Sequence, residues 1–77
     1  MHIIIFKTNV ATTQQVRELQ VLLHEVLVIS QCNFDLDDCD RILRIVSTDP
    51  HAQIVCRLLQ TKGFDCEVME SFLVPVI

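Results

Sequence analysis

The chain has 77 residues, of which 51% are hydrophobic and 21% are charged, with a formal net charge of −4. This length allows one domain, residues 1–77, and the composition is that of an ordinary globular protein. The acidic balance excludes a surface that tracks nucleic-acid phosphates, which needs clustered basic residues. The apolar runs are far shorter than the ~20 residues of a membrane helix, and no signal-peptide pattern precedes them. A cytoplasmic protein without a membrane partner is therefore expected.

The N-terminal part predicts a strand followed by a helix. His2 to Thr8 is rich in β-branched residues, which favours a strand. Thr12 and Gln15 have the spacing of a capping box, so a helix should begin there. The apolar residues that follow recur with helical spacing and share one arc of the helical wheel: Val16, Leu19, Leu22, Leu23, Val26 and Leu27. These are predicted to face the core.

The middle of the chain predicts a β-hairpin. Apolar and polar residues alternate from about Ile29, then a polar turn spans Asp37 to Asp40, and a second strand runs from Arg41 to Ser47. The alternation predicts one inward set: Cys32, Phe34, Leu36, Leu43 and Ile45. Ile42 and Val46 should then point to the opposite side of the sheet.

The C-terminal part predicts a second helix and a last strand. Ser47-Thr48-Asp49-Pro50 offers a capping oxygen before a proline at the first helical position. Gly63, the only glycine, should end this helix in a left-handed conformation. The predicted inward residues of the helix are Ala52, Val55, Leu58 and Leu59. Phe64 to Met69 predicts the final strand, and residues 71–77 form an apolar tail that is long enough to cross back over the sheet.

The order of these elements is β-α-β-β-α-β. Right-handed crossovers then give a ferredoxin-like α+β sandwich: a four-stranded antiparallel sheet in the order 4-1-3-2, with two helices on one face. This fold hosts many unrelated functions, so function must be argued from particular residues.

Several of these residues resemble those of a known family, the heavy-metal-associated domain of copper chaperones and metal-pumping ATPases. Leu19, Leu23 and Val26 match the spacing of that family's first helix, and Val28-Ile29 stands where the family has Gly-Val. Gly63-Phe64 matches the Gly-Phe that closes its second helix. Its second strand, typically V-x-V-D-L, is matched by Cys32, Phe34, Asp35 and Leu36. The resemblance covers roughly residues 3–69.

The metal motif of that family is M-x-C-x-x-C, in the loop before the first helix. Its two thiolates bind Cu(I), which is a soft ion. On this resemblance the methionine position is Val10, and the two cysteine positions are Thr12 and Gln15. None of these is a soft donor, so no metal is expected at the family site and no cofactor is expected for the chain.

The four cysteines, Cys32, Cys39, Cys56 and Cys66, show no CxxC spacing and are expected to be free thiols. Cys32 and Cys66 should be packed in the core, and Cys56 at the edge of the helix's apolar arc. Cys39, in an acidic turn, should be the most exposed. It is the candidate ligand for an alternative function, a soft-metal protein that holds Cu or Zn with non-family cysteine ligands.

The sheet face away from the helices is the leading candidate site. Strand parity places Ile3, Ile5, Ile42 and Val46 on it, and the tail adds Phe72 and Leu73. A contiguous exposed apolar patch usually binds a partner. The leading hypothesis is therefore a non-enzymatic interaction module that uses this face to bind a protein partner or a second copy of the chain. A small-molecule-binding regulatory domain is the remaining alternative, and no residue set supports catalysis.

Overall fold

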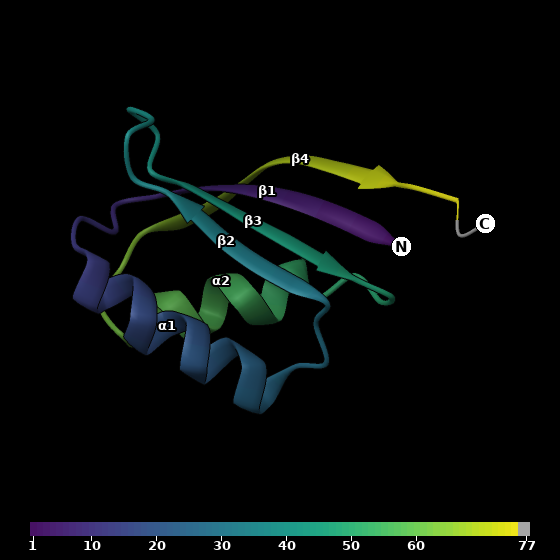
Figure 1. Cartoon of the computed structure of the whole chain (residues 1–77), viewed down its shortest axis with the longest axis horizontal. Coiled ribbons are helices and arrows are strands. Elements are labelled where there is room, and N and C mark those ends of the chain that lie inside the picture. Colours follow the sequence, from purple (N-terminus) through teal and green to yellow (C-terminus); the bar gives the residue numbers. More distant parts are fainter. Residues whose placement is uncertain (76–77) are drawn as a thin grey trace.

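The computed structural model describes residues 1–75 and confirms the predicted order of elements. These are β1 (His2–Thr8), α1 (Thr13–Val26), β2 (Gln31–Asp35), β3 (Ile42–Ser47), α2 (Ala52–Thr61) and β4 (Cys66–Leu73). The sheet is antiparallel with the order β2-β3-β1-β4, and both helices lie on one of its faces (Figure 1). The chain is therefore the predicted ferredoxin-like α+β fold.

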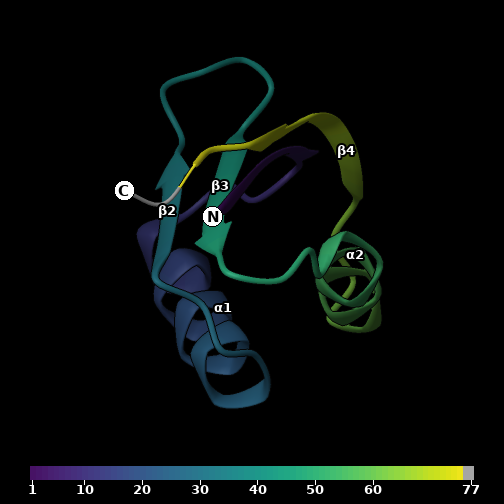
Figure 2. The ribbon, with the colours of Figure 1, turned by 90° about the vertical axis from the view of Figure 1, so that its right-hand side faces the viewer.

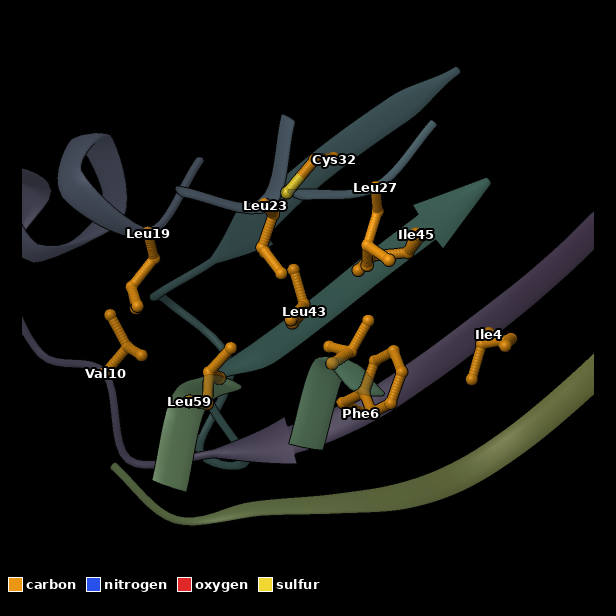
Figure 3. Packing of buried hydrophobic residues seen from close by; sticks show 11 residues of the cluster. Ile4, Phe6, Val10, Leu19, Leu23, Leu27, Cys32, Leu43, Ile45 and Leu59 are labelled. Atoms are coloured by element: carbon orange, nitrogen blue, oxygen red, sulfur yellow. The ribbon is translucent and has the colours of Figure 1, made fainter. Parts of the chain in front are cut away.

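The core fills the space between the helices and the sheet (Figure 3). Leu19 and Leu23 of α1 and Leu59 of α2 meet Phe6 and Leu43 of the central strands, and all are buried. The prediction that Val26 faces this core is wrong, because Val26 is exposed in the last turn of α1. Leu27 is instead the buried residue, since its extended backbone turns the chain back towards the sheet after the helix ends.

The two helices lie under different parts of the sheet. Figure 2 shows α1 beneath β2 and β3, while α2 lies beneath β4. α1 begins at the predicted capping box, in which Thr12 and Gln15 bond reciprocally. α2 ends in a Schellman motif at Gly63, whose φ is +89°. The predicted start of α2 is wrong: the helix begins at Ala52, two residues beyond Pro50.

The α2 start differs because the capping oxygen is used elsewhere. The Ser47 hydroxyl donates to the backbone carbonyl of Asp49 at 2.5 Å, which holds this segment in a bend before the helix. His51 occupies the N-cap position and makes no capping hydrogen bond with its side chain.

β4 is longer than the sequence predicts. It continues through Leu73, and the Val74 N–H donates to the Met1 carbonyl at 2.7 Å beyond its end. The first residues of the predicted tail therefore extend the sheet edge beside β1 instead of crossing the sheet. Positions 76–77 of that tail lie outside the described residues. A shift in register between Ile5 and Phe6 marks an irregularity in this pairing.

Candidate interaction face

The side chains on the sheet face away from the helices stand in cross-strand rows. We call this surface the open face. In its first row, Ile3 of β1 lies between Val46 of β3 and Phe72 of β4. In the second, Ile5 lies between Arg44 and Glu70. An apolar row thus lies beside a mixed row that carries both signs of charge.

The predicted residues differ in how much surface they present. Val46 points to the open face as predicted, but it is only 9% exposed. It stands on the central strand β3, with Ile3 directly opposite on one side and Gln31 on the other, so its neighbours flank it closely. Ile3, Ile5 and Ile42 are half-buried. The prediction of four exposed β-branched residues is therefore wrong for Val46.

The exposed part of the apolar surface lies on β4. Phe72, at the end of the first row, is 48% exposed. Leu73 is 72% exposed, but it pairs with His2 and so points to the side opposite Phe72. The prediction that both belong to one face is wrong for Leu73, because neighbouring residues of a strand alternate.

The sequence reading missed the edge of β4 as a surface. Val68, Met69 and Val74 are exposed along it, in addition to Phe72 and Leu73. β4 is an edge strand, and among the described residues its outer side has no strand partner. The sequence predicts a tail from residue 71 because this apolar segment contains Pro75, whereas β4 continues through Leu73 before that proline.

The charged groups around the open face form few fixed contacts. Lys7 Nζ lies 3.7 Å from Asp40 Oδ1, in an ion pair that is substantially exposed to solvent. Glu67 pairs with Lys7 across the β1–β4 ladder. An apolar row with charges of both signs at its side can take a partner of complementary shape and charge pattern.

The residues at the family's metal-binding positions do not fit a soft cation. Val10 is fully buried in the core. The Gln15 N–H donates to Thr12 Oγ1 at 3.1 Å, and Gln15 Oε1 accepts from the N–H groups of Ala11 at 2.9 Å and Thr12 at 3.2 Å. These bonds cap the helix, so Thr12 Oγ1 and Gln15 Oε1 are already used, and neither residue carries sulfur.

Cys39 lies at the tip of the β2–β3 hairpin, exposed as predicted. Its sulfur and the carboxylates of Asp38 and Asp40 lie within 4.8 Å of one another. The carboxylate of Asp38 accepts from the Asp40 N–H at 2.9 Å, a bond that shapes the turn. Cys39 is the only soft donor in the group, and local turn bonding accounts for the arrangement.

The other cysteines are unpaired in the structure. Cys32 is buried on β2, and its burial raises the pKa of this thiol to about 11. Cys56 of α2 and Cys66 of β4 are both half-buried and pack against the core. Burial, followed by the neighbouring Cys56, raises the pKa of the Cys66 thiol well above its ordinary value.

A groove also lies between α1 and the turn from α2 to β4, with a volume of about 480 Å³. Leu19, Leu22 and Phe64 contribute apolar groups to it, and Glu18 and Lys62 contribute charges. It is one candidate place for a small molecule under the regulatory-domain alternative. Its charged groups come from exposed side chains, so they do not form a preorganised site.

No family model, curated protein or solved structure matches this chain. Within residues 1–75, neither helix combines the length and the apolar character needed to cross a bilayer.

Proposed function

We propose that the chain is a small non-enzymatic interaction module, which binds a protein partner through the open face and the adjoining part of β4. The supporting observation is the apolar row of Val46, Ile3 and Phe72, which crosses three strands without a helix above it. Its exposed member, Phe72, stands at the sheet edge.

Physical reasons favour binding over a solvated role for this surface. Full burial of an apolar side chain such as Phe72 contributes about 1.5–3 kcal/mol. The edge strand β4, on which Phe72 lies, also offers backbone groups on its outer side to a partner. Arg44 and Glu70, on either side of Ile5, supply charges that can fix how the partner is oriented.

The same proposal accounts for the residues that resemble the heavy-metal-associated family. The helix spacing and the Gly-Phe turn support the sandwich, while a helix cap stands where that family has its metal ligands. On this view the chain uses a metal-carrier type of scaffold for binding protein, with no metal at that loop.

The test compares the parent chain with Phe72→Glu and with Val28→Glu. Val28 is an apolar residue that is 85% exposed in the loop after α1, so it is a matched control away from the open face. Sedimentation over a wide concentration range measures self-association, the simplest form of the proposal. We expect a concentration-dependent dimer, weakened roughly tenfold or more by Phe72→Glu and unchanged by Val28→Glu.

Amide chemical shifts followed over the same dilution series locate the contact. We expect the shifts of Ile3, Arg44 and Phe72 to change with concentration, while those of Val28 stay constant. A parent chain that remains monomeric with constant shifts at every concentration has a solvated open face, and self-association through it is then excluded. A dimer equally weakened by Val28→Glu would place the contact elsewhere.

A further inference from the structure

The outer edge of β4 leaves backbone hydrogen-bonding groups free near the end of the strand. The Met1 amino group donates to the Val74 carbonyl at 2.9 Å, and the Val74 N–H donates to the Met1 carbonyl at 2.7 Å. These reciprocal bonds make Met1 and Val74 a hydrogen-bonded pair, and such pairs alternate with pairs whose backbone groups point away from the neighbouring strand. Phe72 therefore bonds to β1, whereas Ser71 and Leu73 direct their N–H and C=O groups outward.

Nothing within residues 1–75 covers this edge. β4 is the last strand in the sheet order, and both Ser71 and Leu73 are exposed. The C-terminal half of β4 extends beyond the ends of both helices (Figure 1). The irregularity in its pairing with β1 lies earlier in the strand, so residues 70–74 follow β1 in regular register. A regular, uncovered edge of this kind is a template for a further strand.

We propose that a second copy of the chain adds its own β4 to this edge, antiparallel, with the two-fold axis at Phe72. Ser71 of each copy then pairs with Leu73 of the other, and their outward N–H and C=O groups bond reciprocally. The two sheets join into one continuous sheet. The proposal rests on the proposed function, because it names the partner and the way in which the open face and β4 bind it.

The side chains favour a second copy because the apolar rows of the two copies become continuous. In each copy Val46, Ile3 and Phe72 stand side by side across three strands. The two-fold axis is perpendicular to the sheet, so the two open faces lie on the same side. Phe72 then meets Phe72 of the second copy in a pair without hydrogen bonds, where side chains are closest. The exposed surface of Phe72 is thereby buried against an identical aromatic side chain.

The charge of β4 disfavours an axis nearer to the middle of the strand. Residues that pair across two strands share a face, so the axis passes through a single residue. An axis at Glu70 would set two carboxylates directly opposite each other, which is destabilising. With the axis at Phe72, Glu70 instead lies opposite Val74 of the second copy. The two carboxylates are then at opposite ends of the paired segment.

Backbone geometry disfavours the axes on either side of Phe72. An axis at Leu73 would pair Ser71 with Pro75, which has no N–H to donate. An axis at Ser71 would pair Leu73 with Met69, the residue that the β1–β4 ladder leaves without a partner at its irregularity. Phe72 is thus the position around which the regular segment 70–74 can pair with itself completely.

Amide hydrogen exchange of the full chain, measured at low and high protein concentration, tests this pairing. We expect the Ser71 and Leu73 amides to exchange roughly tenfold or more slowly at the high concentration, where the dimer forms. The Phe72 amide bonds to β1 in either state, so it should be protected at both concentrations. A dimer that stacks its open faces without strand pairing leaves the Ser71 and Leu73 amides in fast exchange. That result overturns the inference while the proposed function stands.

Ser71→Pro and Ser71→Ala form a matched pair of variants. Proline removes the outward N–H, which has no role within one copy, whereas alanine keeps it. We expect sedimentation to show a dimer weakened roughly tenfold or more by Ser71→Pro and unchanged by Ser71→Ala. A protected Phe72 amide shows that β4 of Ser71→Pro remains on β1, and the exchange rates of the parent decide the matter even where proline displaces the strand. The inference is overturned if folded Ser71→Pro dimerises like the parent, or if the parent is monomeric at every concentration.

Discussion

The side chain of Asn9 binds Asp65 across the end of the sheet with two hydrogen bonds. The Asp65 N–H donates to Asn9 Oδ1 at 2.8 Å, and Asn9 Nδ2 donates to Asp65 Oδ2 at 3.2 Å. Asn9 directly follows β1, and Asp65 directly precedes β4. The pair therefore joins the loop before α1 to the turn after α2, next to Cys66.

Replacing Asn9 should destabilise the chain to an extent that depends on charge. Asn9→Ala removes both bonds and leaves the partly solvated Asp65 N–H to water, which should cost about 0.5–1.5 kcal/mol. Asn9→Asp keeps an acceptor but places a carboxylate beside Asp65, so it should cost more at pH 7. Denaturant unfolding in low and high salt measures the loss of stability in each variant.

Added salt separates the loss of the hydrogen bonds from the repulsion between the carboxylates at positions 9 and 65. Because screening weakens repulsion between exposed carboxylates, the difference between Asn9→Asp and Asn9→Ala should shrink as salt is added. If Asn9→Asp and Asn9→Ala have equal stability at low salt, a carboxylate at position 9 does not repel the Asp65 carboxylate measurably.

The capping box of α1 gives a second prediction. Thr12→Ala removes the oxygen that accepts from the Gln15 N–H, so the free energy of unfolding should fall by about 1 kcal/mol. Thr12→Ser keeps the acceptor and should stay close to the parent. Thermal or denaturant unfolding measures the difference, and equal losses in both variants would assign it to the lost methyl group rather than to the cap.

The same loop tests the resemblance to the heavy-metal-associated family. Thr12→Cys combined with Gln15→Cys places two soft donors at that family's ligand positions, so Cu(I) should bind one to one in competition with a chelator. The matched control, Thr12→Ser with Gln15→Ser, should not bind. If the double cysteine variant folds but binds no tighter than this control, the loop lacks the geometry that the resemblance implies.

The local signals in the sequence were sufficient for most of the fold. Thr12 with Gln15, and Gly63 at the end of α2, were predicted because their hydrogen-bonding chemistry is contained within a few residues. The alternation of residues 42–46 gave the correct faces of β3. The start of α2 at Pro50 was predicted wrongly because the Ser47 hydroxyl donates to the Asp49 carbonyl, a competing bond that residue spacing does not reveal.

The candidate site was less predictable because it depends on pairing between distant segments. Parity within β3 places Val46 on the open face, but its burial follows from its neighbours on two other strands. The position of Phe72 beside Ile3 requires the register of β4, including its irregularity next to Ile5.

Gly63 supplies a prediction about backbone conformation alone. A Cβ at this position would meet no atom within 4 Å, so a substitution causes no clash. Its φ of +89° is nevertheless unfavourable for residues with a side chain, and Gly63→Ala should therefore destabilise the chain by about 1–2 kcal/mol. Gly63→Asn should lose less, because asparagine tolerates left-handed backbone better. The prediction is contradicted if Gly63→Ala has a higher free energy of unfolding than Gly63→Asn.

The buried thiol of Cys32 predicts a loss of stability at alkaline pH. Its pKa is raised from the ordinary value of 9.0 to about 11 by burial. Between these values the unfolded chain has released a proton that the native chain still holds, so the free energy of unfolding falls as pH rises. The stabilising effect is complete below pH 9 and is lost progressively as pH rises through the native pKa. Burial of Cys66 acts in the same direction.

Cys32→Ala isolates this contribution from the packing that the same residue provides. Loss of the sulfur should lower stability at every pH, but the variant should decline less steeply than the parent above pH 9, because one thiol no longer ionises on unfolding. The chain has no tyrosine, so phenol ionisation does not obscure the range. Cys39→Ala, at the exposed hairpin tip, is the matched control and should retain the parent's slope. Parallel curves for the parent and Cys32→Ala would show that the Cys32 thiol is solvated enough to ionise in the native chain.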